Sequence, residues 1–156
     1  MSIKNWNEIT DLVNKLKNQN RRIVFTNGCF DIIHAGHVQY LQEAKALGDI
    51  LIIGLNSDAS VKRLKGAERP VNNQNDRAIV LSALKSVDYI VVFDEDTPYD
   101  LIKQIKPDIL VKGGDWPENK IVGHDIVKAN GGIVKSLSFR PGNSSTSIIE
   151  KMKNNG

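Results

Sequence analysis

The sequence predicts an α/β fold in which a doubly wound, five-stranded parallel sheet is covered by helices on both faces. Two observations support this prediction. Short runs rich in Val and Ile alternate along the chain with helical patterns, and near-continuous apolar strands are typical of parallel sheets that are buried on both faces. With 156 residues, the chain has the length of one ordinary domain, so we expect a single domain overall.

The first expected element is an amphipathic helix within residues 1–20. Its apolar residues recur at a spacing of three and four and form one face: Trp6, Ile9, Leu12, Val13 and Leu16. We expect this helix to pack on the outside of the sheet. Residues 21–153 are then expected to form the main body of the domain, and residues 153–156 a polar tail.

Five apolar runs follow and are the expected strands: residues 22–26, 50–55, 89–93, 109–111 and 133–137. Helical patterns lie between them, each followed by a Gly, Asp or Pro stop signal: residues 36–47, 75–85, 98–105 and 124–129. In a doubly wound sheet, the ligand binds beyond the carboxyl ends of the strands, where the strand order reverses. The residues that directly follow strands are therefore the first candidates for a site.

Composition argues against several classes of protein. The longest apolar run, residues 50–55, is too short to span a bilayer, and no export signal is visible. The single cysteine, Cys29, allows no intramolecular disulfide, which agrees with a cytoplasmic location. The net charge of +3 comes from basic residues interspersed with acidic ones, so we expect neither a nucleic acid nor a membrane partner.

One segment, residues 62–77, departs from this even mixture. It contains more basic than acidic side chains: Lys62, Arg63, Lys65, Arg69 and Arg77 against Glu68 and Asp76. Such a local surplus suits a small polyanion better than a duplex.

The most informative motif is H-x-G-H, formed by His34, Gly36 and His37 between the first strand and the first long helix. A helix that begins near Gly36 points its free N–H groups and the positive end of its dipole above the sheet, which favours phosphate. Two imidazoles there can donate to phosphate oxygens, while Gly28 and Gly36 let phosphates approach the backbone. The alternative is that His34 and His37 only cap and pack the start of the helix.

Two other sites are disfavoured by the same segment. His34 and His37 have no cysteine cluster near them, and the third histidine, His124, is remote, which argues against zinc. No G-x-G-x-x-G follows the first strand, which argues against a dinucleotide site. Cys29 lies in the phosphate-facing segment, but nothing marks it as a nucleophile.

Seven motifs extend the pattern over nearly the whole chain: T-N-G-C-F-D-I-I-H-A-G-H at 26–37, G-D-I-L-I-I-G-L-N-S-D-A-S-V-K-R-L-K-G at 48–66, R-P-V at 69–71, D-R-A-I-V-L at 76–81, F-D-E-D-T-P at 93–98, V-K-G-G-D-W at 111–116 and G-N-S-S-T-S-I-I at 142–149. With these motifs the chain resembles the H-x-G-H nucleotidyltransferases, in the cytidylyltransferase-like branch. Within that branch it is most similar to heptose 1-phosphate adenylyltransferases.

The resemblance implies a Rossmann-like nucleotidyltransferase fold and a reaction. AMP would pass from ATP to D-glycero-β-D-manno-heptose 1-phosphate, giving ADP-heptose and pyrophosphate, with Mg²⁺ accompanying ATP. It also implies a homodimer. In some relatives this domain is fused to a sugar kinase, for which 156 residues leave no room, so we expect a separate kinase to supply the acceptor.

The resemblance also implies site residues. The catalytic set is His34, His37, Lys62 and Lys65. The nucleotide would contact Asn27, Gly28, Cys29, Phe30, Gly36, Gly113, Gly114, Asp115, Arg140, Ser144, Ser145 and Thr146. The acceptor would contact Asp31, Arg77, Lys112 and Trp116. Asp31 would lie near the acceptor phosphate or a metal, but no side chain is assigned to a metal, which the phosphates would hold.

Some of these roles have plainer alternatives. Residues 144–146 place hydroxyls and free N–H groups together at a helix start, which fits either a second anion site or a simple N-cap. Lys62 and Lys65 could lie on a solvated helix face, Lys112 could end a strand in solvent, and Trp116 could serve packing. Residues 143–146 read N-S-S-T, where heptose enzymes more often have C-S-T-T.

Two alternative functions remain. The first is a glycerol-3-phosphate cytidylyltransferase that uses CTP, because it shares the H-x-G-H motif and the late Ser/Thr segment. The second is a non-catalytic module that senses ATP. Release of pyrophosphate, tested with each nucleotide and acceptor, separates the three hypotheses.

Overall fold

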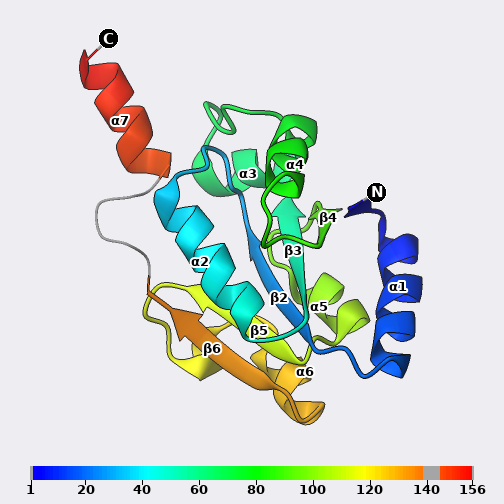
Figure 1. The fold of residues 1–156 in the computed structure, drawn as a ribbon. Coiled ribbons are helices and arrows are strands. Elements are labelled where there is room, and N and C mark those ends of the chain that lie inside the picture. Colours follow the sequence, from blue (N-terminus) through cyan, green and yellow to red (C-terminus); the bar gives the residue numbers. More distant parts are fainter. Residues whose placement is uncertain (1, 139–144, 156) are drawn as a thin grey trace.

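The computed structural model describes residues 2–138 and 145–155 and confirms the α/β fold (Figure 1). Within these residues, six parallel strands form one sheet in the order β1-β4-β3-β2-β5-β6. The strands are β1 (Ile3–Lys4), β2 (Ile23–Gly28), β3 (Ile50–Asn56), β4 (Tyr89–Phe93), β5 (Ile109–Gly113) and β6 (Ile133–Leu137).

The expected number of five strands was wrong by one. The additional strand, β1, is two residues long and pairs Ile3 with Ile90 and Lys4 with Val91 at the edge of the sheet. Two residues carry no detectable alternation of apolar and polar side chains, so no sequence pattern predicts this strand. The other five strands confirm the predicted segments, with β2 and β5 extended by two residues at their carboxyl ends.

Seven α-helices lie among the described residues: α1 (Trp6–Asn18), α2 (Ala35–Ala46), α3 (Asp58–Lys65), α4 (Gln74–Ser82), α5 (Tyr99–Ile105), α6 (His124–Ala129) and α7 (Ser145–Asn155). A short 3₁₀ turn, Glu118–Lys120, precedes α6. None of the helices in the part of the chain that the structure describes is both long and apolar enough to cross a membrane.

The helices cover the sheet from both sides, as Figure 1 shows for α1 and α2. Successive strand residues point to opposite faces. Val24 of β2 therefore packs in one apolar cluster with residues of α2 and α4, and Phe25 packs in the other with residues of α1, α5 and α6. Two buried faces explain why the strands are apolar without interruption, as the sequence indicated.

Helix α1 begins with a capping box, in which the Asn5 side chain accepts from the Glu8 N–H and Glu8 accepts from the Asn5 N–H. The buried side chains Ile9 and Val13 join the core, and the Trp6 indole donates to the Val92 carbonyl at 3.0 Å. These contacts attach the helix to the sheet. The division into residues 1–20 and 21–153 stays a prediction.

The strand order reverses between β2 and β5. From β2 the chain adds β3, β4 on one side, and then β5, β6 on the other. Residues Val24 and Phe25 of β2 pair with Ile109 and Leu110 of β5, so the carboxyl ends of these two strands lie side by side. This is the place where a doubly wound sheet binds its ligand.

Candidate functional site

The segment between β2 and α2, residues 29–34, is held in one conformation by its own side chains. Phe30 has a positive φ of 46°, is almost fully buried, and lies 5.2 Å from the His37 ring, centroid to centroid. A Cβ at Gly28 would come within 2.8 Å of the Phe30 ring. Glycine at position 28 is therefore required to let Phe30 fold back and close the segment against α2.

The two histidines cap the helix that follows. His34 is the N-cap of α2, and its Nδ1 accepts from the His37 N–H at 3.4 Å. The His37 Nδ1 accepts in return from the His34 N–H, also at 3.4 Å. The rings stack with their centroids 3.9 Å apart. Capping, the alternative weighed from sequence, is thus real, but it uses only one nitrogen of each ring.

The second ring nitrogen of His34, Nε2, takes no part in capping, and its role depends on the protonation state of the ring. Burial lowers the pKa of His34. Burial, with the charges of His34 and Lys65, lowers the pKa of His37 to about 4, against a backbone hydrogen bond with Ile32 that raises it. Both rings are therefore neutral at pH 7, and a neutral ring whose Nδ1 accepts carries its proton on Nε2. The His34 Nε2 is buried without a hydrogen-bond partner among the described residues.

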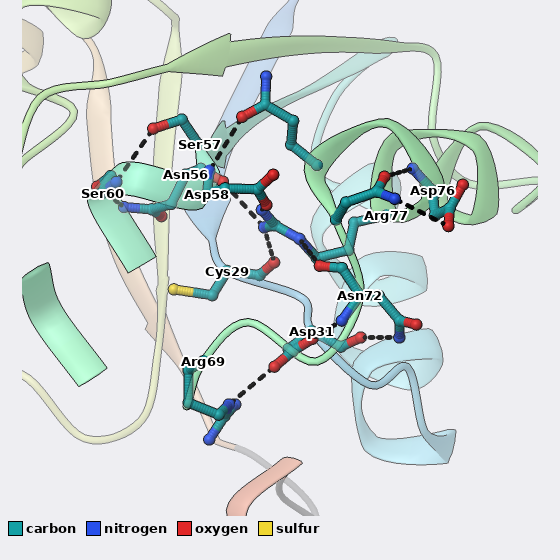
Figure 2. A network of polar contacts seen from close by, with 12 residues as sticks. Cys29, Asp31, Asn56, Ser57, Asp58, Ser60, Arg69, Asn72, Asp76 and Arg77 are labelled. Atoms are coloured by element: carbon teal, nitrogen blue, oxygen red, sulfur yellow. Dashed lines mark hydrogen bonds and ion pairs between the residues drawn. The ribbon is translucent and has the colours of Figure 1, made fainter. Parts of the chain in front are cut away.

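Arg77 ties this segment to the rest of the sheet edge (Figure 2). The side chain is fully buried, and its Nη1 donates to the carbonyls of Cys29 at 2.7 Å and Asn56 at 2.9 Å. Its Nε donates to the Asn72 carbonyl at 2.9 Å, and its Nη2 to Asp58 Oδ1 at 2.9 Å. Arg77 therefore joins β2, β3 and the start of α4, while its expected contact with an acceptor stays a prediction.

Asp31 also makes its hydrogen bonds within the protein. Its fully buried carboxylate accepts from the N–H groups of Val71 and Asn72 at 2.9 Å and from Arg69 Nε at 2.8 Å. Burial alone would raise the pKa of Asp31, but these hydrogen bonds and the Arg69 charge outweigh it and leave the pKa lowered. Both oxygens are engaged, so no lone carboxylate oxygen is offered here to a metal.

A cavity of about 340 Å³ opens where the strand order reverses. Asn27, Gly28 and Cys29 from the end of β2 line it, together with Lys65 of α3 and Lys112 of β5. Its remaining wall includes apolar side chains, Leu64, Pro98, Val111, Ile121 and Val122. The structure thus brings together five of the sequence-predicted site residues around one space.

A second cavity, of about 450 Å³, lies on the other side of Lys65. Arg69 and Glu68 border it from the segment after α3, and Glu150 and Lys153 border it from α7. Lys65 lines both cavities. Lys62 is exposed and lines none of the cavities described, so only one of the two predicted lysines is placed at the site.

The segment after β5 contains the remaining described candidates. Gly113 ends the strand, Gly114 has a φ of 97°, and Asp115 accepts from the Ser138 hydroxyl at 3.5 Å. Trp116 is 48% exposed, and its ring centroid lies 5.2 Å from Lys112 Nζ. Trp116 is therefore available at the surface rather than buried in the core.

The last predicted segment is described only in part. Arg140 and Ser144 lie outside the described residues. Ser145 and Thr146 open α7, which agrees with the expected helix start after the fifth strand predicted from sequence.

Sequence reasoning missed three members of this site: Asp58, Arg69 and Asn72. Their roles depend on pairings with residues 19, 38 and 41 positions away in the chain. The basic surplus in residues 62–77 and the R-P-V motif at 69–71 both contain Arg69, but neither gave it a role.

Comparison with known families decides the class of this protein. A family described as cytidylyltransferase-like matches residues 25–151. The chain belongs to this family. The match confirms the family and the nucleotidyltransferase class that the motifs indicated.

Relatives within the cytidylyltransferase-like family are close in sequence. The bifunctional protein HldE of a Nitratiruptor species is 58% identical over 151 residues, which are 97% of this chain and 32% of that protein. The bifunctional protein HldE of Wolinella succinogenes is 58% identical over 145 residues, 93% of this chain and 30% of that protein. The chain thus spans about a third of the length of these curated relatives.

Solved structures show the same fold. The lipopolysaccharide core biosynthesis protein from Thermoplasma volcanium is similar with a TM-score of 0.62 and 29% identity, over 77% of this chain and 97% of that chain. Pantoate-beta-alanine ligase from Francisella tularensis is similar with a TM-score of 0.65 and 16% identity, over 98% of this chain and 77% of that chain. The latter likeness concerns the fold alone.

Proposed function

We propose that this chain is an adenylyltransferase that transfers AMP from ATP to D-glycero-β-D-manno-heptose 1-phosphate and releases pyrophosphate. The observation that carries the proposal is the Nε2 of His34, which is buried without a hydrogen-bond partner among the described residues, at the start of the helix that follows β2. The identity with HldE proteins and the likeness to a lipopolysaccharide core biosynthesis protein support a heptose acceptor.

The acceptor needs little activation. A phosphate monoester is already an anionic nucleophile, so its oxygen attacks the α-phosphorus of ATP in line, the bond to the departing pyrophosphate breaks, and no general base is required. This agrees with histidines that burial keeps neutral, because neutral rings donate hydrogen bonds without exchanging a proton. Catalysis then comes from positioning and from stabilising negative charge.

His34, His37 and Lys65 are the groups to which we assign that stabilisation. The Nε2 of His34 donates to a phosphate oxygen, and the N–H groups in the first turn of α2 add their dipole. Lys65 lines both cavities and forms no ion pair within residues 2–138 and 145–155, so its charge is free to meet a phosphate. We also propose that Lys62, which is exposed, contributes positive charge to the phosphates, as the resemblance implies.

The two substrates meet at the cavity between β2 and β5. Lys112 and Trp116 are proposed acceptor contacts, with Asn27, Gly28 and Cys29 facing the nucleotide phosphates. Gly113, Gly114 and Asp115 would border the nucleoside. The start of α7, with Ser145 and Thr146, and the neighbouring Arg140 and Ser144 would bind the β- and γ-phosphates.

The hydrogen bonds of the Asp31 carboxylate bear on how Mg²⁺ is held and on what Asp31 and Arg77 do. Both oxygens of Asp31 are engaged by the protein, so we propose that Mg²⁺ is held by substrate phosphates, whose charge it neutralises. Asp31 and Arg77 then act by fixing the segment that contains His34. We further propose that the protein acts in the cytoplasm, where ATP is supplied, and as a homodimer.

The proposal is tested by measuring pyrophosphate release with ATP or CTP and an array of acceptors: the β and α anomers of the heptose 1-phosphate, and glycerol 3-phosphate. We expect the highest kcat/KM for ATP with the β anomer. Preference for CTP with glycerol 3-phosphate would replace the proposal by the cytidylyltransferase alternative. Tight ATP binding without pyrophosphate release with any acceptor would indicate an ATP-sensing module.

A further inference from the structure

Arg69 stands in the R-P-V motif at residues 69–71, and the resemblance assigns it no role at the site. It lies in the turn after α3, where its N–H donates to the Gly66 carbonyl at 3.1 Å. Its side chain is 13% exposed and forms an ion pair with Asp31, Nε to Oδ2 at 2.8 Å. The other end of the same guanidinium is different, because the Arg69 Nη2 is buried without a hydrogen-bond partner among the described residues.

An unpaired buried donor destabilises the folded protein unless a bound group accepts its hydrogen bond. Leaving a buried hydrogen-bond donor unpaired costs about 1–3 kcal/mol of folding free energy, and more when the donor belongs to a charged group. Arg69 cannot relieve the cost by turning away. Its Nε is bound to Asp31, and Asp31 is itself held by the N–H groups of Val71 and Asn72. The protein therefore holds the Nη2 in place, with its donor capacity unused.

The electrostatic surroundings favour an anion. Burial raises the pKa of the Cys29 thiol, while the charges of Lys65, Arg77 and Arg69 act to lower it, so Arg69 and Lys65 both lie within electrostatic reach of the phosphate-facing segment. Both border the cavity of about 450 Å³ next to α7. The negative charges around this cavity are Glu68, which pairs with Lys153 at 3.3 Å, and Glu150.

We propose that Arg69 is a phosphate-binding residue of this site, whose Nη2 donates to an anionic oxygen of a substrate phosphate alongside Lys65. The inference rests on the proposed function in naming a substrate, since the phosphate belongs to either the nucleotide or the sugar phosphate. It adds to the predicted site a residue from the segment after α3, which the sequence had placed in a basic surplus and in the R-P-V motif without assigning it a role.

The chemistry of arginine explains why this position is not lysine. The guanidinium is a planar fork, so its Nε can hold Asp31 while its Nη2 reaches a second anion. An ammonium group is a single point charge and cannot occupy both places. Arg69→Lys should therefore keep the charge and lose the bridging geometry.

The experiment compares Arg69→Lys with Arg63→Lys, the same change at an exposed arginine on α3 that pairs with Asp96. ATP affinity is measured by calorimetry without acceptor, and KM is measured for each substrate. We expect Arg69→Lys to weaken ATP binding, or to raise the KM of the sugar phosphate alone, by roughly tenfold or more, the value of a charge-assisted hydrogen bond. Weaker ATP binding would mean that Arg69 contacts a nucleotide phosphate, and a raised KM for the sugar phosphate alone would mean that it contacts the acceptor phosphate. Unchanged affinities and KM values in a folded Arg69→Lys would overturn the inference.

A second measurement on the unaltered protein covers the case in which the variant fails to fold. Nitrogen-15 NMR follows the guanidinium signals of Arg69 while inorganic triphosphate, and separately inorganic phosphate, is added. A saturable shift with either anion supports the inference, and no shift with both refutes it. Neither the NMR titration with anions nor ATP calorimetry needs turnover. Both results can therefore be interpreted even if the pyrophosphate assay rejects the proposed reaction.

Discussion

Two groups of polar side chains share one edge of the sheet and differ in how their hydrogen bonds are used. The anchor group, Asp31, Asp58, Asn72 and Arg77, binds its partners within the protein (Figure 2). The donor group consists of His34 Nε2 and Arg69 Nη2, which are buried without a partner among residues 2–138 and 145–155, and of the exposed Lys65, which lines both cavities.

The difference separates groups that hold the fold from groups that await a ligand. Buried polar atoms in native proteins nearly always have partners, so buried exceptions indicate a missing ion or substrate. The two groups also meet within single side chains. Within the part of the chain that the structure describes, Arg69 is bound through Nε and has no partner at Nη2, and His34 caps α2 through Nδ1 and has no partner at Nε2. His34 Nε2 and Arg69 Nη2 are thus positioned by the hydrogen bond that the other nitrogen of the same side chain makes.

The largest effect is expected in the anchor group, for Arg77→Met. The change leaves the carbonyls of Cys29 and Asn56 without their donor and removes the partner of Asp58. An acceptor left without its donor costs about 1–3 kcal/mol of unfolding free energy, so we expect a loss of about 2–6 kcal/mol for the two carbonyls, which urea denaturation measures. Arg63→Met is the matched control, since its exposed pair with Asp96 is screened by water and should add little to stability. Similar losses in the two variants would argue against an anchoring role.

The donor group should affect turnover more than stability. We expect His34→Ala and His37→Ala each to reduce kcat by about two orders of magnitude or more, while the lost cap costs only about 1 kcal/mol. Steady-state kinetics and thermal melting measure the two effects. His34→Asn sharpens the test because asparagine is a good N-cap but lacks the Nε2 donor, so it should stay stable and remain slow. Near-normal turnover in both alanine variants would remove the histidines from the proposed mechanism.

A smaller effect is expected for Asp31→Asn, and it depends on pH. The pKa of Asp31 is lowered in the folded protein, so the charged carboxylate adds stability above its unfolded pKa, and this stability is lost as the pH falls through the lower, folded value. At pH 7 the variant should lose roughly 1–3 kcal/mol. Urea denaturation between pH 7 and pH 3 should show a shallower acid dependence than in the unaltered protein. Asp96→Asn, at an exposed pair, should leave that dependence unchanged.

The smallest effect concerns the titration of His37. Its pKa is lowered to about 4, so its NMR signal should stay constant from pH 8 to about 5.5 and change only below that range. Because the neutral form is favoured by folding, stability from this group is present above its ordinary pKa of about 6.5 and declines as the pH falls toward the folded value. Added ATP should move the midpoint upward, since a nearby anion favours the charged ring. A midpoint near 6.5 without ATP would contradict the buried, neutral state.

Local sequence patterns determined much of this protein. The apolar runs at residues 50–55 and 89–93 became β3 and β4, and the spacing of Ile9, Val13 and Leu16 became the buried face of α1. The H-x-G-H motif marked a helix start at the edge of the sheet. These features depend on residues within one or two turns of each other, so periodicity and the order of residues suffice to predict them.

Only the tertiary structure decided how the polar groups divide between anchoring and binding. Arg77 reaches Cys29, 48 positions earlier, and Arg69 reaches Asp31, 38 positions earlier. Lys62 and Lys65 are both exposed, but Lys65 lines these two cavities and Lys62 does not. No local pattern reports such pairings. A buried donor is satisfied or left unpaired according to which distant segment folds against it, and that is settled only when the sheet has assembled.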